Sequence, residues 1–363
     1  MYDAIIVGAR CAGSPLAMLL ANAGRRVLLL DRSTFPSDTV STLAITGDGA
    51  FRLQRWGLLN RVLDSGCPPV HRVRFWVDGE WFGVEPPLMN LCPRRYALDE
   101  ILFRAAEEAG VHCVEGASVR RVLWEDGRVC GVRYQDRSGK DVEARATVVV
   151  GADGRNSMVA REVSAELHNE RPGATCAYFS YWKGIPADEM EIYFGLRRAV
   201  FLFPTHDDSV LLAAQWPGEE FADYRSDPLN NLISSFRLAP GLSQRVRAGE
   251  RIAPVVGMLT PDSYFRRSAG PGWALAGDAG NFKDPILGLG INDAFRSADQ
   301  LAEAIEAGLS GMLPMDEALA GYEAIRDKTS LGSYQVTHRF ASLNVSPAML
   351  SSLVERLDNR RSA

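Results

Sequence analysis

The first thirty-one residues constrain the fold more than any other part of this chain. Residues 2–7 form an apolar, β-branched run that predicts a buried strand, and a turn of small residues, 8–13, follows. A helical pattern then covers residues 14–23, and a second apolar run, 26–31, ends in an acid, Asp31. The order strand, glycine turn, helix, strand is that of the βαβ unit of a dinucleotide-binding domain.

The residues of this unit suit a bound pyrophosphate, because the N-terminus of the first helix offers unpaired N–H groups and a positive dipole end. Gly8 would permit the turn, Gly13 would let helix and strand approach, and Asp31 could accept hydrogen bonds from ribose hydroxyls. Arg10 stands where the middle glycine of G-x-G-x-x-G is expected. Its guanidinium must therefore point away from the pyrophosphate or contact a phosphate or the substrate. We also expect Cys11, Ala12 and Arg32 to contact the nucleotide.

Composition excludes several classes of protein. The chain has 363 residues, of which 46% are apolar, enough for one large or two small domains. A net charge of −5 without a basic stripe argues against a nucleic-acid partner. The apolar runs are too short for a membrane span, and no secretory leader pattern opens the sequence, so we expect a cytoplasmic protein. The six cysteines lie far apart without a C-x-x-C pair, so we expect neither a disulfide framework nor a metal site.

The rest of the chain alternates helical and strand patterns. An Asp-Gly pair between alternating apolar residues predicts a hairpin over 71–87. A helix should end near Gly110, and an aromatic-rich β region should span 176–216. We also expect strands at 111–115, 119–124, 128–134, 142–144, 147–151 and 273–277, a polar helical stretch at 219–247, a long helix at 291–309 and mostly helix from 313 onward.

Two further motifs stand in register with the N-terminal unit. The first is Asp153-Gly154 after a buried strand, and the second is Gly277-Asp278-Ala279 followed by Pro285 and by Gly288-x-Gly290-Ile291-Asn292. Together the three motifs resemble those of the para-hydroxybenzoate hydroxylase-like FAD superfamily. That superfamily includes group A aromatic hydroxylases, flavin-dependent halogenases and geranylgeranyl reductases. The resemblance covers nearly the whole chain and implies that FAD is the cofactor.

The resemblance also implies roles for single residues. Asp278 would hold a ribityl hydroxyl, Pro285 would contact the isoalloxazine, and Asp153 with Gly154 would lie near the pyrophosphate and assist nicotinamide docking. Arg95 would lie near the flavin, with Arg94 an almost equal candidate. The helix that opens at Gly288, Gly290, Ile291 and Asn292 would present its N–H groups and dipole to the flavin N1–C2=O edge. Thr39, Ser41, Val119 and Gly277 complete the expected cofactor-binding set.

The implied fold is α/β, with a Rossmann-like FAD-binding domain that has a parallel sheet and a β-meander, an inserted antiparallel-sheet substrate domain and C-terminal helices. We expect residues 1–70, 93–172 and 265–330 to form the FAD-binding domain, 71–92 and 173–264 the substrate domain, and 331–363 a C-terminal helical segment. The inserted sheet should roof the isoalloxazine. Some of its aromatic residues should line an apolar substrate pocket, and alternate ones should pack the sheet against the FAD domain.

Departures from the family patterns bear on the activity. Gly280-Asn281 replaces the Ala-His that aromatic hydroxylases usually carry, and Phe282-Lys-Asp-Pro285 resembles the Phe-x-Asp-Pro of halogenases and reductases. The segment 181–186 lacks the spacing of the halogenase W-x-W-x-I-P motif. Lys183 and Lys283 are the lysines to compare with the catalytic one of halogenases. Ahead of Phe203-Pro204, Ala199 and Phe201 replace two aromatics of the geranylgeranyl reductases.

The preferred hypothesis is an FAD-dependent monooxygenase that hydroxylates an aromatic or polycyclic small molecule. NAD(P)H would reduce the flavin, O2 would add at C4a, and the peroxyflavin would transfer oxygen to an electron-rich ring, with Pro285 and Arg95 beside the reacting ring. Because only one nucleotide fingerprint is present, NAD(P)H would bind transiently, or a partner flavin reductase would deliver reduced flavin. His206 is the histidine to consider as a base. The alternatives are a double-bond reductase or dehydrogenase, a halogenase, and a non-catalytic FAD-binding protein.

Overall fold

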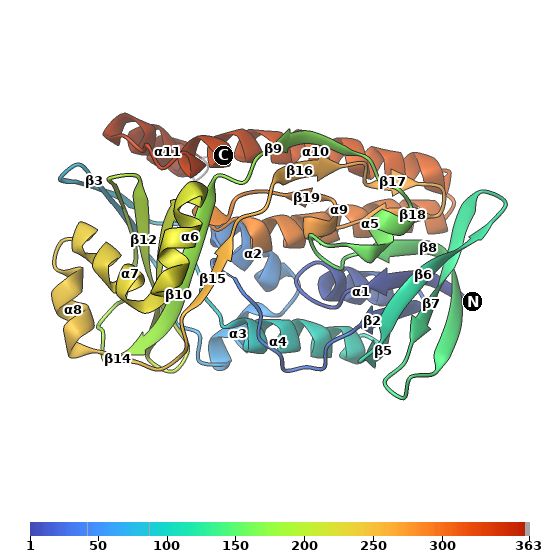
Figure 1. Cartoon of the computed structure of the whole chain (residues 1–363). Helices are drawn as coiled ribbons and strands as arrows, with labels where there is room; N and C mark the ends of the chain where they lie inside the picture. The colour runs from blue at the N-terminus through green and yellow to red at the C-terminus, as the bar shows by residue number, and fades with distance from the viewer. Residues whose placement is uncertain (42, 87, 360–363) are drawn as a thin grey trace.

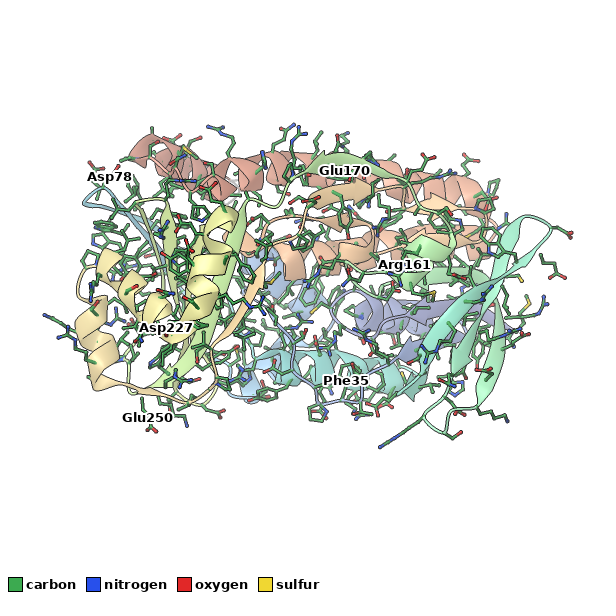
Figure 2. The ribbon with its side chains drawn as sticks, viewed as in Figure 1. Phe35, Asp78, Arg161, Glu170, Asp227 and Glu250 are labelled. Carbon is green, nitrogen blue, oxygen red and sulfur yellow. The ribbon has the colours of Figure 1, made fainter. Side chains whose placement is uncertain are left out.

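The computed structural model describes residues 1–41, 43–86 and 88–359, with side chains to residue 355. A mostly parallel sheet with its helices lies beside a larger antiparallel sheet, and the long helix α10 (Met315–Ala341) extends over both (Figure 1). Figure 2 places Arg161 on the first of these halves and Asp227 and Glu250 on the second. This is the predicted α/β architecture. No helix among the described residues is long and apolar enough to cross a membrane.

The first sheet has the strand order β17-β18-β8-β1-β2-β5. Its central strands pair in parallel, and their paired stretches are largely buried apolar runs that pack on both faces, as in β1, where Ala4 and Ile6 face one side and Ile5 and Val7 the other. The strands are β1 (Tyr2–Val7), β2 (Val27–Asp31), β5 (His112–Glu115), β6 (Ser118–Glu125), β7 (Arg128–Gln135), β8 (Asp141–Gly151), β17 (Ala269–Gly270) and β18 (Trp273–Leu275).

Strand β8 differs from the prediction, which divided it into 142–144 and 147–151. It is one continuous strand, because no turn residue interrupts it. Its first half alternates between exposed and buried residues and pairs antiparallel with β7 of the meander. From Ala146 onward it is largely buried and pairs in parallel with β1, and from Val149 also with β18. The same strand therefore joins the meander to the nucleotide-binding sheet.

Helices cover one face of this sheet, and the meander with α5 (Met158–Glu162) covers the other. The first helix ends as predicted, with Gly24 in the left-handed region at φ +81°. The covering helices are α1 (Gly13–Asn22), α2 (Gly47–Arg55), α3 (Leu59–Asp64), α4 (Arg95–Glu108) and α9 (Gly290–Leu309), with α10 packed on α9.

The second sheet has the order β14-β10-β13-β12-β11-β3-β4, with β15 added beside β10. Neighbouring strands are antiparallel except β3 and β11, which pair in parallel. The predicted hairpin is present, with Asp78 and Gly79 at φ +49° and +89°. The strands of this second sheet are β3 (Val73–Val77), β4 (Glu80–Val84), β10 (Thr175–Lys183), β11 (Met190–Gly195), β12 (Arg198–Thr205), β13 (Ser209–Pro217), β14 (Glu250–Arg251) and β15 (Val256–Leu259).

The aromatic residues of this sheet alternate between two faces. One set, which includes Tyr178, Trp182 and Trp216, packs with residues of α7 (Pro228–Ser235) and α8 (Leu242–Ala248) on the outer face. The expectation that alternate aromatics would pack the sheet against the FAD domain was therefore wrong for this set. The predicted helical stretch covers this outer face. It forms η1 (Gly218–Glu220), α6 (Phe221–Ser226), α7, η2 (Phe236–Leu238) and α8.

A small third sheet and the C-terminal helices join the two halves. Strands β9 (Leu167–Arg171), β16 (Ser263–Arg266) and β19 (Asn281–Phe282) form this sheet. The loop after β18 also contains η3 (Gly277–Ala279) and η4 (Pro285–Leu287). Helix α11 (Pro347–Asn359) follows α10 and packs near β4.

Candidate functional site

A cavity of about 750 Å³ lies between the two sheets. The carboxyl ends of β1, β2 and β8 form one wall with the N-termini of α1 and α9, and the inner face of the second sheet forms the other. Ligands of open α/β sheets bind at this edge. The predicted residues that line the cavity are Gly8, Arg10, Cys11, Ala12, Asp31, Arg32, Thr39, Ser41, Arg95, Val119, Asp153, Gly154, Gly277, Asp278, Pro285, Gly290 and Ile291.

Gly13, Gly288 and Asn292 were also predicted to bind the cofactor, but they do not line the cavity. A Cβ at Gly13 would lie 1.8 Å from the carbonyl oxygen of Gly8, so Gly13 lets the helix approach the turn. Gly288 adopts φ +63° in the turn before α9. The Oδ1 of Asn292 accepts a hydrogen bond from the Thr46 N–H at 3.2 Å, so this side chain is directed toward α2.

The turn after β1 is held by Asp31. Its Oδ2 accepts the Ala9 N–H at 2.7 Å and its Oδ1 accepts the Ser33 N–H at 2.7 Å. Each carboxylate oxygen keeps a further acceptor site, so Asp31 can still bind a ribose hydroxyl from the cavity wall. Gly8 adopts φ +101°, and a Cβ there would lie 2.4 Å from the Ala152 carbonyl oxygen. Any other residue at position 8 would push the turn away from β8.

Arg10 is directed toward α4 and the loop after β2. Its guanidinium pairs with Asp99, donates to Ser37 Oγ at 3.0 Å and lies 5.6 Å from the centroid of the Phe35 ring. Asp99 is fully buried and also accepts hydrogen bonds from Arg95 at 3.0–3.1 Å. Arg10 therefore helps to neutralise the carboxylate that positions Arg95. Of the two arginines expected near the flavin, Arg95 lines the cavity and Arg94 does not.

Asp153 leaves a hydrogen-bonding position open. Its Oδ2 accepts the Met158 N–H at 2.6 Å and the Val159 N–H at 3.3 Å. Its Oδ1 is buried and has no partner among the described residues. Burial raises the pKa of this carboxyl group. A buried polar atom without a partner is costly in an interior, so a donor from a molecule in the cavity would satisfy it.

Asp278 is a partly buried acid on the same wall. Burial raises the pKa of Asp278 to about 6; the nearby Asp293 carboxylate adds to this, and Arg95, Arg155 and Lys283 oppose it. A strongly perturbed carboxyl group in a cleft is a common feature of binding sites.

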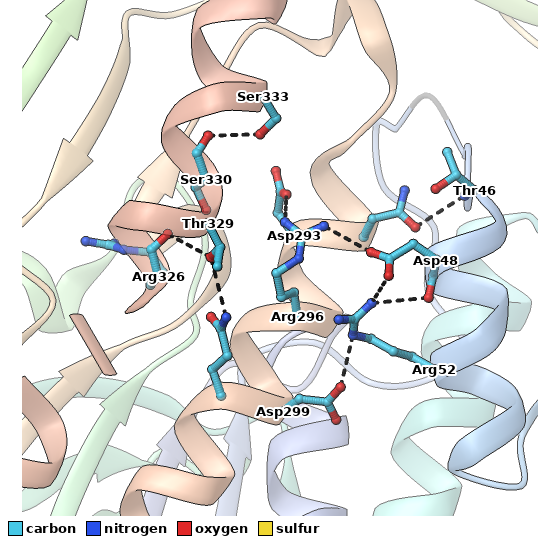
Figure 3. A network of polar contacts seen from close by, with 12 residues as sticks. Thr46, Asp48, Arg52, Asp293, Arg296, Asp299, Arg326, Thr329, Ser330 and Ser333 are labelled. Carbon is cyan, nitrogen blue, oxygen red and sulfur yellow. Dashed lines mark hydrogen bonds and ion pairs between the residues drawn. The ribbon is translucent and has the colours of Figure 1, made fainter. Parts of the chain in front are cut away.

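The N-terminus of α9 points into the cavity at Gly290 and Ile291. A Cβ at Gly290 would meet no atom within 4 Å, so this glycine leaves open space where the helix dipole ends. A chain of polar contacts fixes the start of the helix (Figure 3). In it, Asp293 pairs with Arg296 at 2.9 Å, Arg296 with Asp48 at 3.0 Å, and Asp48 with Arg52 at 2.6 Å.

Lys283 belongs to the same network. Its ammonium group lies 2.7 Å from Asp293 and 2.7 Å from Ser333 Oγ, and its side chain is only 5% exposed. Among the described residues, Lys283 is the one lysine that lines the cavity. Its charge is already paired with Asp293. Lys183, the other candidate for comparison with halogenases, is exposed at the end of β10 and does not line the cavity.

The wall formed by the second sheet is apolar except at one end. Phe179, Phe201, Phe203, Leu211 and Ala213 line it from adjacent strands. Thus part of the sheet's aromatic set lines the cavity, as predicted. Two polar residues, Gln215 and Asp284, stand at the end of this wall. Gln215 was not predicted, and Asp284 was noted only as part of the Phe282-Lys-Asp-Pro285 motif, because their contact with each other is tertiary.

His206 does not line the cavity. It is buried, its Nδ1 accepts the Arg94 N–H at 3.1 Å, and its Nε2 lies 3.0 Å from Ser65 Oγ. Burial lowers the pKa of His206, which keeps the ring neutral as this acceptor role requires. We therefore assign His206 a structural role between β12 and the start of α4, and not that of a base.

Comparison with known proteins identifies the class. The sequence model of one family, described as FAD binding domain, matches residues 1–216. The chain belongs to this family, and it is an FAD-dependent oxidoreductase. The residues fit the cofactor: the partnerless Oδ1 of Asp153, the open space at Gly290 and two helix N-termini face one cavity.

Three relatives have different activities. A digeranylgeranylglycerophospholipid reductase of Methanopyrus kandleri is 29% identical over 84% of this chain and 81% of its own length. The structure of the flavin-dependent brominase Bmp2 has a TM-score of 0.86 at 22% identity, covering 98% of this chain and 93% of that one. The structure of pqsL, a probable FAD-dependent monooxygenase from Pseudomonas aeruginosa, has a TM-score of 0.79 at 22% identity, covering 94% and 96%. The two structural similarities establish the fold.

Proposed function

We propose that this enzyme is an FAD-dependent monooxygenase that hydroxylates an aromatic or polycyclic small molecule with NAD(P)H and O2. The observation that carries the proposal is the composition of the cavity. An aromatic, apolar wall lines the same cavity as Pro285 and the N-terminus of α9. Lys283, the one lysine among the described lining residues, is held by Asp293 and Ser333. Such a wall suits a planar ring, whereas the halogenase reaction requires a lysine that is free to hold hypohalous acid.

The bound flavin would supply the oxygen-transfer chemistry, and the protein would position it and exclude water. Asp31 and Asp153 are the groups we expect to hold the ribose and pyrophosphate parts, and Asp278 a ribityl hydroxyl. The N–H groups at Gly290 and Ile291 would stabilise negative charge on the ring. Arg95, fixed by Asp99, would add a second positive group at the same site.

The apolar wall would exclude water and place the substrate ring. Phe179, Phe201 and Phe203 offer ring faces and edges to an aromatic substrate. Pro285 would close the opposite side of the pocket. No acid–base side chain is needed for oxygen transfer, since the effective concentration of two correctly placed reactants supplies much of the rate.

A second candidate, a double-bond reductase, is favoured by the 29% identity to the digeranylgeranylglycerophospholipid reductase. Its isoprenoid substrate class would also fit an apolar wall. The two hypotheses differ in their need for oxygen. A monooxygenase product gains one oxygen atom and forms only in air, while a reductase product gains two hydrogens and forms without air.

The test uses purified, FAD-loaded protein with a panel of phenols, polycyclic arenes and isoprenoids. Flavin bleaching by NADH and by NADPH is followed without oxygen, and products are then identified by mass after air is admitted. We expect an O2-dependent gain of one oxygen atom without added halide. A product that forms anaerobically would replace the proposal with the reductase, and a product that requires chloride or bromide would replace it with a halogenase.

Nicotinamide would bind transiently, or a partner flavin reductase would deliver reduced flavin. Repeating the panel with chemically reduced flavin separates these routes. If turnover appears only under that condition, we expect a partner. If neither source of electrons gives any product, the non-catalytic alternative is favoured.

A further inference from the structure

Four buried polar residues meet where the second sheet contacts the loop before Pro285. They are Thr175 of β10, Gln215 of β13, Thr260 after β15 and Asp284, and none is more than 5% exposed. Gln215 and Asp284 also line the cavity. A buried polar cluster in an apolar wall is costly unless its members satisfy one another, so the directions of its hydrogen bonds are informative.

Asp284 sets those directions because an ionised carboxylate can only accept. Its Oδ1 accepts the Ile286 N–H at 3.0 Å and Gln215 Nε2–H at 3.2 Å, and its Oδ2 accepts the Thr175 hydroxyl at 2.8 Å. Burial raises the pKa of Asp284, and these three donors oppose that shift. The geometry sets the direction of each hydrogen bond, because three donors converge on the two oxygens of this carboxyl group.

The donors and acceptors among the other three residues of the cluster follow from these bonds. Thr175 uses its single hydrogen on Asp284, so its oxygen can only accept from Thr260 Oγ1, at 3.0 Å, and from Gln215 Nε2, at 2.9 Å. The two N–H groups of the Gln215 amide are thereby both used, one on Thr175 and one on Asp284. The amide cannot turn over without placing its oxygen against the carboxylate.

The carbonyl oxygen of Gln215, Oε1, takes no part in these hydrogen bonds. None of the described residues donates a hydrogen bond to Oε1, although Gln215 lines the cavity. Its cross-strand neighbours are Ala177 of β10 and Ala199 of β12, which are too short to cover the amide. The rest of this wall is apolar, so Oε1 is the fixed polar feature that the sheet offers to a molecule in the cavity.

We propose that Gln215 is a specificity-determining residue whose Oε1 accepts a hydrogen bond from a hydroxyl or amino group of the ligand, and that Asp284 and Thr175 are positioning residues for it. The inference rests on the proposed function insofar as the ligand is an aromatic ring beside Pro285. A ligand without such a donor would leave the acceptor unsatisfied, and sites built to pair with a polar group discriminate strongly against analogues that lack it.

The experiment compares matched ligands that differ only in the donor. Oxidised, FAD-loaded protein is titrated by calorimetry, without NAD(P)H, with naphthols against methoxynaphthalenes and with indole against N-methylindole. The wild-type protein should bind the donor-bearing member of each pair at least about tenfold more tightly. Gln215→Met should reduce this preference to less than about twofold, since a thioether is at best a weak acceptor.

Two further variants sharpen the test. Asp284→Asn keeps the shape but supplies an amide that can donate to Gln215, so the Gln215 amide can turn over and the preference for donors should fall or reverse. Gln244→Met makes the same chemical change as Gln215→Met on the exposed surface of α8 and should keep the wild-type preference. The FAD content of each preparation reports folding, and the wild-type comparison does not depend on any variant.

The proposal is overturned if the wild-type protein binds both members of each pair equally, if it binds none of these arenes, or if folded Gln215→Met keeps the preference. Since binding is measured without turnover, failure of this inference can be distinguished from failure of the proposed function. A protein that prefers the donor-bearing ligands but never oxygenates them contradicts the monooxygenase hypothesis alone. A protein that oxygenates arenes without this preference contradicts the role of Gln215 alone.

Discussion

Replacing Asp278 with Asn should stabilise the apoprotein and weaken cofactor binding at the same time. Burial raises the pKa of this carboxyl group to about 6 from its ordinary value of 3.8. In the unfolded chain the Asp278 carboxyl group ionises near its ordinary pKa. Between the unfolded and folded pKa values, the folded protein therefore still binds a proton that the unfolded chain has released. Stability contributed by the protonated form is therefore present at low pH and is lost as the pH rises through about 6.

At about 1.4 kcal/mol per pKa unit, the ionised group costs the apoprotein up to about 3 kcal/mol above pH 7. At pH 5 about half of that cost remains, because the folded protein still holds most of the proton. Asp278→Asn removes the titration altogether. Its stabilising effect should therefore grow by up to about 1.4 kcal/mol between pH 5 and pH 8.

The assay is urea denaturation of apoprotein at several pH values, with Asp64→Asn on the exposed end of α3 as the matched control. In parallel, FAD titration should show roughly tenfold weaker binding to Asp278→Asn, because a neutral amide is a poorer acceptor than a carboxylate. A stability difference that does not change with pH would refute the assignment of the raised pKa to Asp278. Unchanged FAD affinity would refute its role in holding the cofactor.

Four other predictions concern the turn and the helix N-termini. Arg10→Gly should keep FAD affinity within about threefold, since the guanidinium binds Asp99 and not the nucleotide; a collapse in equilibrium dialysis would show that it is a phosphate ligand. Asp99→Ala should destabilise the protein by about 3–5 kcal/mol in denaturant titrations, because it leaves buried arginine charge unpaired. Gly13→Ala should prevent folding or FAD binding, as its Cβ would lie 1.8 Å from the Gly8 oxygen. Gly290→Ala should leave the thermal midpoint of the apoprotein within a few degrees, because its Cβ would meet no protein atom, but should weaken FAD binding, because Gly290 lines the cavity.

The sequence was sufficient for the parts of the fold that depend on local pattern. The βαβ unit, the hairpin at Asp78-Gly79 and the long helix after Gly290 each have a periodicity or turn chemistry that acts over a few residues. The motifs that share one cavity were also predictable, because strands of a parallel sheet bring their carboxyl ends to one edge. Strand β8 shows the limit of this approach. The sequence changes from an alternating to a continuous apolar pattern near Ala146, where the strand changes partner, and one continuous strand was therefore divided into two.

The partners of individual side chains were not predictable. Arg10 and Asp99 are 89 residues apart, and only the packing of α1 on α4 brings them together. Asn292 matched a cofactor motif, yet its side chain is directed toward Thr46, 246 residues away. Gln215 carries no local pattern, and the motif that contains Asp284 does not reveal its partner; the hydrogen bond between them joins the second sheet to the loop before Pro285. Position along the chain suggests which residues face the cavity, while the charge and direction of each group depend on tertiary contacts.

The loop at residues 284 and 285 connects the two halves of the site. Asp284 is hydrogen-bonded to Thr175 and Gln215 of the second sheet. The next residue, Pro285, lines the cavity where we expect the flavin ring. A proline has few backbone conformations, so a displacement at Asp284 would be transmitted to Pro285 and not absorbed between them. Ligand contact with Gln215 should therefore alter the surroundings of the flavin. In Asp284→Asn, the ligand-induced change in the flavin absorption spectrum should be smaller than in wild type at equal ligand occupancy; a change of equal size would show that the two residues act independently.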